Sequence, residues 1–297
     1  MPSLPARGVN AEPFATPDLP EGRAVELTGR GTTWVREAGP LDGAPVLLLH
    51  GWTASSALNW FASYRPLAEA GHRVLAIDHR GHGRGIRSAR RFRLADCADD
   101  AVALLDIVGV DRAIVVGYSM GGPIAQLLWQ RHPSRVDGLV LCATATRFRD
   151  AQAERVPGGV VSGMFGTASF AARLLPPGLR SRVSERVLIA KYDDTALGRW
   201  AAQEARRNHL RSIIDAAHEL SRFDSSDWIG RVDVPTAVVL SERDQTVPPE
   251  EQQRLADSIT GATVHRVDAR HDMCATRPDR FNAALLAACR DVHSRID

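Results

Sequence analysis

One serine of the chain lies in a glycine-rich segment, Gly117-Tyr118-Ser119-Met120-Gly121, which fits the pattern G-x-S-x-G. The run AIVVG before the serine is typical of a buried strand, and the run GGPIAQLLWQRH after it is typical of a helix. A serine on a sharp turn from strand to helix is the arrangement called a nucleophile elbow. Glycines at 117 and 121 suit such a turn, because side chains there would collide with neighbouring backbone. We therefore predict that Ser119 is a nucleophile, against the alternative of a glycine-rich turn without a catalytic role.

A serine hydroxyl needs a base within hydrogen-bond reach to attack near neutral pH, and ten histidines compete for this role. His271 directly follows the last strand-like run and precedes the terminal helix. It should therefore lie on a loop at the same sheet edge as Ser119, although a surface histidine is the alternative. Five others have simpler explanations: His50 leads an HG turn, His79 and His82 belong to an exposed basic loop, His132 ends a helix and His265 lies within a strand.

An imidazole that works as a base needs an acid to fix its tautomer and to stabilise its protonated form. Asp244 lies where the run VVLSERD leaves the sheet. Glu242 is two residues earlier and would point to the other side of an extended chain. The loop after residue 145 offers no carboxylate before Asp150, which also favours Asp244.

Two main-chain donors should stabilise the oxyanion that forms when the serine attacks a carbonyl. The N–H of Met120, at the start of a helix, is one candidate, and the N–H of Trp52, after His50-Gly51, is the other. The rings of Trp52 and Trp60 either line an acyl pocket or belong to the core. The tentative substrate-binding residues are Trp52, Trp60, Tyr118, Phe165 and Val247.

The elements that must position these residues alternate between strands and helices. Apolar, β-rich runs occupy 46–51, 73–78, 113–119, 138–145, 236–244 and 263–270, after two alternating runs at 23–29 and 32–39. Helical spacing marks 59–70, 94–108, 121–131, 250–259 and 278–292. The pattern predicts an α/β fold: a mostly parallel twisted sheet of about eight strands with helices on both faces.

The domain organisation is predicted as a core with one insertion. Residues 1–22 should form an N-terminal arm, 23–146 and 225–297 the core, and 147–224 a helical cap over the carboxyl ends of the strands. In the cap we expect apolar side chains to face Ser119 while its many arginines face water. These apolar side chains are Met164, Phe165, Phe170, Leu174, Leu188 and Trp200.

Composition excludes several classes of partner. The 297 residues carry 37 Lys and Arg against 35 Asp and Glu, a net charge of +2, which is too weak to favour nucleic acid or an anionic membrane. Lys191 is the only lysine. No run approaches the ~18 apolar residues of a membrane span, and four cysteines without metal-ligand spacing predict free thiols. A cytoplasmic enzyme acting on a small molecule is the expectation.

Five motifs together resemble the α/β-hydrolase superfamily in order and spacing, over roughly residues 23–293. They are HGW at 50–52, DHRGHG at 78–83, GYSMGG at 117–122, ERDQTVP at 242–248 and RHD at 270–272. The resemblance implies a triad of Ser119, Asp244 and His271, an oxyanion hole at Trp52 and Met120, and no cofactor. Serine at the elbow separates the chain from the similar dehalogenases and epoxide hydrolases, which carry aspartate there. Arg270 departs from the family, which usually has glycine before the histidine.

The function predicted from these residues is hydrolysis of carboxylic esters through an acyl-enzyme, with short or medium acyl chains. Cofactor-free perhydrolase or haloperoxidase chemistry, and hydrolysis of carbon–carbon bonds or enol-lactones, are the alternatives with the same triad. A non-catalytic ligand receptor is a rival of another class. His79 and His82 lack the accompanying carboxylates of a metal site, so no metal is predicted. The arginine run after the DHRGHG motif is interpreted as a solvated loop: Arg84, Arg87, Arg90, Arg91 and Arg93.

Overall fold

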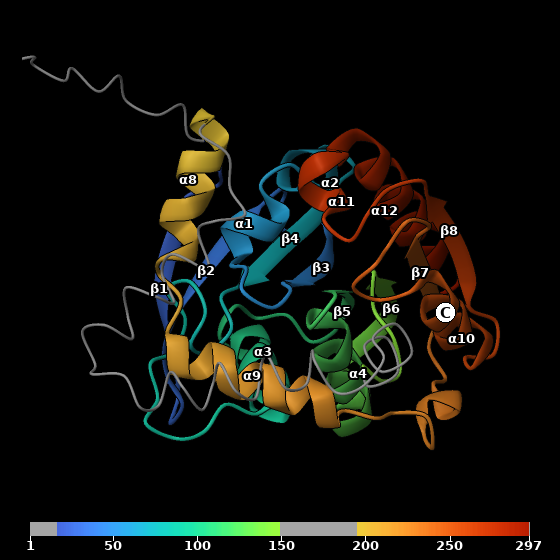
Figure 1. Ribbon diagram of the computed structural model, residues 1–297, viewed down its shortest axis with the longest axis horizontal. Coiled ribbons are helices and arrows are strands. Elements are labelled where there is room, and N and C mark those ends of the chain that lie inside the picture. The colour runs from blue at the N-terminus through green and yellow to red at the C-terminus, as the bar shows by residue number, and fades with distance from the viewer. Residues whose placement is uncertain (1–16, 149–194, 297) are drawn as a thin grey trace, which may run out of the picture.

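A computed structural model describes residues 17–148 and 195–296, and its centre is one eight-stranded sheet (Figure 1). The strand order is β1-β2-β4-β3-β5-β6-β7-β8. The six strands from β3 to β8 run parallel, while β2 pairs antiparallel with β1 and with β4. The bounds are β1 Gly22–Leu27, β2 Gly31–Ala38, β3 Ala44–Leu49, β4 His72–Ile77, β5 Ala113–Tyr118, β6 Val136–Cys142, β7 Thr236–Ser241 and β8 Thr263–Val267.

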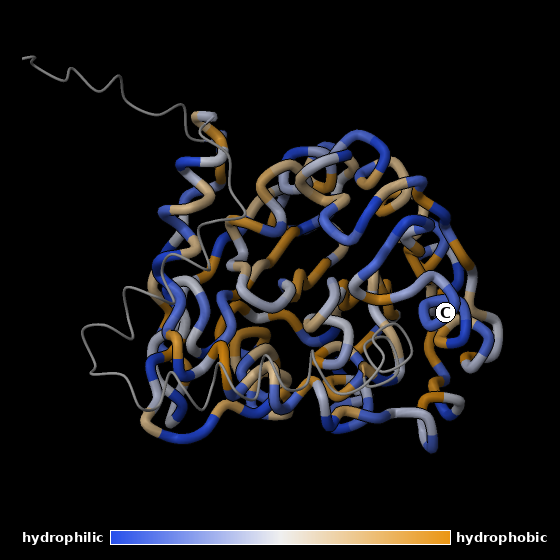
Figure 2. Tube along the Cα trace, viewed as in Figure 1, coloured by the Kyte–Doolittle hydropathy of each residue, from blue (hydrophilic) through white to orange (hydrophobic). Residues whose placement is uncertain are grey.

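Helices cover both faces of the sheet, as predicted, and alternate strand residues separate the two cores. In β3, Leu47 and Leu49 join one buried cluster, while Val46 and Leu48 join the other. The first cluster is covered by α3 (Leu94–Ile107), α4 (Gly121–Arg131) and α10 (Pro249–Asp257). The second is covered by α2 (Tyr64–Glu69), α11 (Met273–Thr276) and α12 (Pro278–His293). Figure 1 shows α3 and α4 opposite α2 and α12, and Figure 2 shows hydrophobic residues along the strands between them.

The helix predicted over 59–70 is two helices, α1 (Ser56–Trp60) and α2. The helix begins earlier than predicted because the Ser55 hydroxyl accepts a hydrogen bond from Leu58 N–H at 3.2 Å and caps α1. The break follows from Pro66, which has no N–H to donate within a continuous helix but fits the first turn of α2. Two 3₁₀ turns complete the core, Pro133–Arg135 and Ile229–Arg231.

Two helices lie between β6 and β7 in the described part of the predicted insertion, α8 (Ala196–Ala205) and α9 (Leu210–Arg222). The connection between them is tied to core loops. Asn208 Oδ1 accepts from Gly83 N–H at 2.8 Å, and Asn208 Nδ2 donates to the Thr53 carbonyl at 2.8 Å. A bridge between Arg147 and Asp224 joins the two expected ends of the insertion.

Several predictions fall on residues that the structure does not describe. Residues 1–16 of the predicted arm and 149–194 of the predicted cap lie outside the described residues. Five of the expected apolar cap residues are among them: Met164, Phe165, Phe170, Leu174 and Leu188. The sixth, Trp200, is buried, and its ring meets that of Phe61 edge-on with centroids 5.7 Å apart.

All four cysteines are buried and unpaired, as predicted. Within the described ranges, no helix combines the length and the apolar character that crossing a membrane requires.

Candidate active site

Ser119 lies on the turn between β5 and α4, in the left-handed region with a φ of 52°. This conformation is costly for a residue with a side chain and persists only when neighbouring contacts hold it. Here Ser119 N–H donates to the Cys142 carbonyl at 2.9 Å, and the Ser119 carbonyl accepts from the Thr144 hydroxyl at 2.9 Å. The turn therefore presents the serine hydroxyl at the carboxyl edge of the sheet.

The glycines around the serine allow the backbone to pack this closely. A Cβ added at Gly117 would collide with the Gly121 carbonyl, and one added at Gly121 would collide with the Leu49 carbonyl. A Cβ at Gly122 would collide with the Thr144 side chain. The sequence motif thus reflects a steric requirement of the turn.

Ser119, His271 and Asp244 form a continuous hydrogen-bonded chain. His271 Nε2 lies 2.9 Å from Ser119 Oγ, and His271 Nδ1 lies 2.7 Å from Asp244 Oδ2. Ser119 follows β5, Asp244 follows β7 and His271 follows β8, so all three residues lie at the carboxyl edge of the sheet. The predicted strands 236–244 and 263–270 end earlier, at Ser241 and Val267, which places both residues on loops.

The Asp244 carboxylate is fully buried and has four polar contacts. Its Oδ1 accepts from the N–H groups of Thr246 and Val247, at 2.8 and 2.9 Å. Its Oδ2, which faces His271, also lies 3.2 Å from Gln252 Nε2. Such donors hold the carboxylate in one orientation.

Two positioning contacts were not predicted from the sequence. The Tyr118 hydroxyl donates to the main-chain carbonyl of His271. Gln252, on α10, donates to Asp244 and to the Val247 carbonyl and accepts from Ser241 N–H at 3.0 Å. The only sequence signal for the role of Gln252 was its position, in the first half of a predicted helix and eight residues after Asp244.

The two expected oxyanion donors lie on loops that the structure holds in place. Met120 is the residue directly before α4, and its N–H has no hydrogen-bond partner among residues 17–148 and 195–296. The loop with Trp52 is held at Gly51 N–H, which donates to Asn59 Oδ1 at 2.8 Å. The Trp52 indole N–H donates to the Ile213 carbonyl on α9 at 2.9 Å, so α9 also positions this loop.

The tentative substrate-binding residues differ in how deeply they are buried. Trp60 is inaccessible and packs with the rings of Tyr118 and Phe281 at centroid distances of 6.0 and 6.2 Å, which favours the core alternative. Tyr118 and Val247 are also buried, and Trp52 is partly buried. Phe165 lies outside the described residues.

The prediction of an exposed loop at His79 and His82 is wrong, since both imidazoles are buried beside that of His50. The His50 ring lies 4.2 Å from that of His79 and 5.5 Å from that of His82, between centroids. The loop turns inward because Asp78 accepts from Ser56 N–H and from Arg84 N–H, both at 2.8 Å. Burial lowers the pKa of His50 to about 4 and that of His82 to about 3, and it holds the pKa of His79 well below its ordinary value.

The arginine run after this loop is mostly exposed, as predicted, with one exception. Arg84 lies over the Trp34 ring, 5.0 Å from its centroid, and 3.5 Å from Glu204 on α8. Its four neighbours in the run are exposed: Arg87, Arg90, Arg91 and Arg93.

Comparisons with known proteins agree with this architecture. The family described as the alpha/beta hydrolase fold matches residues 44–278. RutD of Variovorax paradoxus, which its name assigns to carbamate hydrolysis, is 32% identical over 258 residues, covering 84% of this chain and 92% of the relative. A non-heme chloroperoxidase of Streptomyces lividans is 28% identical over 88% of this chain and 97% of its own. The solved structure of an esterase from Exiguobacterium antarcticum superposes with a TM-score of 0.75, at 23% identity, over 91% of this chain and all of its own. The chain therefore belongs to the α/β-hydrolase family.

Proposed function

We propose that this α/β-hydrolase cleaves carboxylic esters by a two-step serine mechanism. The observation that carries the proposal is the chain of contacts from Ser119 Oγ through His271 to Asp244 Oδ2, at 2.9 and 2.7 Å. A nucleophile, a base and an orienting acid in this order match the requirements of acyl transfer through a covalent intermediate. Because the proposed reaction uses only groups of the chain and water, it needs no cofactor.

In the first step, Ser119 Oγ attacks the ester carbonyl carbon while His271 Nε2 takes the hydroxyl proton. Asp244 accepts the Nδ1–H of His271, which fixes the tautomer that leaves Nε2 able to accept, and stabilises the imidazolium. The tetrahedral intermediate collapses when His271 gives the proton to the leaving alcohol, which breaks the carbon–oxygen bond. The acyl group then remains on Ser119.

In the second step, His271 takes a proton from water as the water oxygen attacks the acyl carbon. Collapse of this intermediate returns the proton to Ser119 Oγ and releases the carboxylic acid. The N–H groups of Met120 and Trp52 are assigned to the negative oxygen of both intermediates. Main-chain donors on loops that hydrogen bonds fix in place suit this task, because they need little reorganisation during the reaction.

The insertion of 147–224 is proposed as the cap that bounds the acyl site. Support comes from the Trp52 contact with α9 and from the Asn208 contacts with two core loops. Through these contacts, the insertion adjoins the loop that carries an oxyanion donor. A bounded site suits acyl groups that fit inside it, of about two to eight carbons.

Perhydrolase chemistry with the same triad is the second candidate, because one relative is named a non-heme chloroperoxidase. In that reaction hydrogen peroxide replaces water as the acceptor of the acyl group. A carbamate is a further substrate to compare, given the name of the RutD relative.

A series of p-nitrophenyl esters from two to sixteen carbons tests the proposal, run with and without hydrogen peroxide. We expect kcat/KM to peak at about two to eight carbons, with no rise in rate when the substrate exceeds its solubility. Peracid formation faster than hydrolysis would favour the perhydrolase. A preference for chains beyond about twelve carbons, or strong activation at an interface, would contradict the proposed cap.

A further inference from the structure

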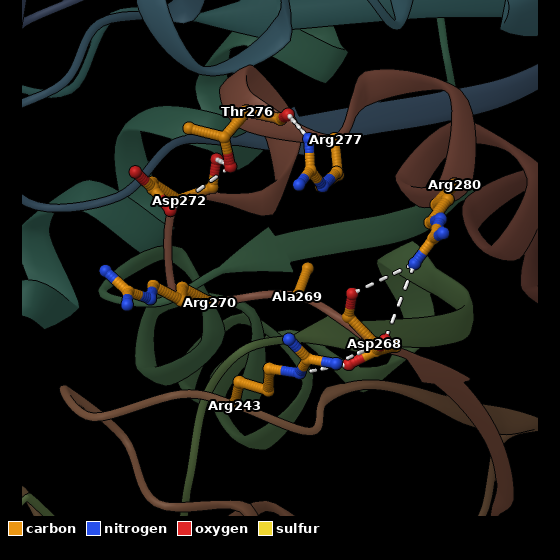
Figure 3. A pocket seen from close by; sticks show the side chains of 8 residues that line it. All are labelled: Arg243, Asp268, Ala269, Arg270, Asp272, Thr276, Arg277 and Arg280. Carbon is orange, nitrogen blue, oxygen red and sulfur yellow. Dashed lines mark hydrogen bonds and ion pairs between the residues drawn. The ribbon is translucent and has the colours of Figure 1, made fainter.

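A hollow of about 550 Å³ lies beside the loops that carry Asp244 and His271 but is lined by other side chains (Figure 3). Its charged residues are four arginines and two aspartates: Arg243, Arg270, Arg277, Arg280, Asp268 and Asp272. Ser119 is not part of its lining, and no step of the proposed reaction uses its side chains.

The hollow has a defined backbone frame. Glu242 N–H donates to the Val267 carbonyl at 2.9 Å, and Arg243 N–H donates to the Ala269 carbonyl at 2.8 Å. These bonds join the loop after β7 to the loop after β8. Arg277 and Arg280 come from the other wall, at the start of α12. The two loops that carry Arg243 and Arg270 are therefore held together by main-chain hydrogen bonds.

Two of the four arginines share one carboxylate. Arg243 contacts both oxygens of Asp268, with Nη2 at 2.8 Å from Oδ2, and Arg280 Nη1 lies 3.6 Å from the same Oδ2. Figure 3 shows these contacts converging on Asp268. The Asp268 carboxylate therefore forms ion pairs with two guanidinium groups.

The other two arginines have no carboxylate partner among the described residues. Arg277 Nη1 contacts only the Thr276 carbonyl, at 3.5 Å, and Arg270 has no ion pair in this part of the chain. Asp272 accepts from the Thr276 hydroxyl at 3.2 Å, and not from an arginine. With four arginines and two aspartates, the side chains that line the hollow carry a net charge of +2.

We propose that this hollow binds a small oxyanion with two negative charges, of the phosphate type. A guanidinium group presents a planar fork of donors that matches phosphate oxygens, and it stays charged at all physiological pH values. Arg277 supplies the unpaired donors, and the pair of Arg243 and Arg280 at Asp268 adds positive potential, while the Arg270 guanidinium points away from these three (Figure 3). The proposal is independent of the ester hydrolase function, because it needs neither Ser119 nor the acyl site.

Titration of the full chain with inorganic phosphate, followed by ³¹P NMR line width at constant ionic strength, tests the proposal. We expect saturable binding with a Kd of about 1 mM or lower, and no competition by chloride at equal ionic strength. Arg277→Gln should weaken phosphate binding about tenfold, because a charge-assisted contact is lost. Asp268→Asn should strengthen it by about threefold or more, because a neighbouring negative charge is removed.

Arg65→Gln is the matched control, since Arg65 lies on α2 with a side chain that is 79% exposed. It should bind phosphate as the unmodified chain does. Phosphate binding that chloride displaces at equal ionic strength would overturn the proposal. If Arg65→Gln and Arg277→Gln weaken phosphate binding equally, the proposal is overturned as well. The phosphate would then be attracted by the overall surface charge and not by this hollow. Opposite effects of Arg277→Gln and Asp268→Asn would support it, and circular dichroism identifies any variant that fails to fold.

Discussion

Gln252 Nε2 lies 3.2 Å from Asp244 Oδ2, the carboxylate oxygen that also faces His271 Nδ1 at 2.7 Å. Asp244, the proposed acid of the triad, is therefore held by a buried amide from α10, together with two main-chain donors on its other oxygen. Because Gln252 also bonds Ser241 N–H and the Val247 carbonyl, it fixes the start and the end of the loop that carries Asp244. We interpret Gln252 as a positioning residue.

Gln252→Ala should lower kcat by roughly tenfold and raise KM little, because the base loses its fixed orientation and not its substrate contacts. The buried Ser241 N–H also loses its acceptor, which should cost about 1–3 kcal/mol of unfolding free energy. Steady-state kinetics and urea unfolding measure the two effects. Gln253→Ala is the matched control, because Gln253 bonds only exposed groups. A kcat for Gln252→Ala equal to that of the control would show that the amide has only a structural role.

Asp244→Asn should preserve the fold and lower kcat by about 10⁴, because an amide favours the wrong tautomer of His271. Glu242→Gln should have little effect, since Glu242 is exposed and makes no contact with His271 among those described. Rates of ester hydrolysis for both variants decide between the two acids. The reverse order of effects would mean that the acid has been misassigned.

Acid should destabilise the fold through the buried histidines. His50, His79 and His82 have lower pKa values in the folded chain than the 6.5 of an unperturbed histidine. The unfolded chain therefore binds more protons, so the free energy of unfolding falls as the pH drops below about 6.5, and the loss continues to about pH 4 and below. Each histidine should cost roughly 1 kcal/mol between pH 6.5 and 5.5. His82→Phe should reduce this fall by about one third.

Urea unfolding at pH 8.0, 6.5 and 5.5 measures the dependence. A stability that is constant between pH 6.5 and 5.5 would contradict the burial of three neutral imidazoles. Among the charged groups that act on His82, Asp78 raises its pKa and Arg87 lowers it.

The sheet and the positions of Ser119, Asp244 and His271 could be predicted because Ser119 and Asp244 each follow a buried apolar strand and His271 follows the last strand before the terminal helix. Carboxyl ends of parallel strands meet at one edge, so sequence order alone places such residues together. The split of the helix predicted over 59–70 was missed, although Pro66 marks it, because the apolar spacing continues across the break.

Other features depend on contacts between distant segments and were not predictable from local pattern. The loop with His79 and His82 has a polar and basic composition, and only its contacts with Asp78 and His50 explain its burial. Gln252 is one of two adjacent glutamines on α10, and only the folded chain distinguishes the one that reaches Asp244. The hydrogen bond from the Trp52 indole to the Ile213 carbonyl likewise depends on how α9 packs on the core.

Labelling with a fluorophosphonate, followed by intact mass and peptide mapping, tests the central claim that Ser119 is an activated nucleophile. We expect one adduct per chain, located on Ser119, because the hydroxyl lies 2.9 Å from His271 Nε2. Ser119→Ala should abolish the adduct, and Asp244→Asn should slow its formation. An adduct on another serine, or none on well-folded protein, would contradict the account.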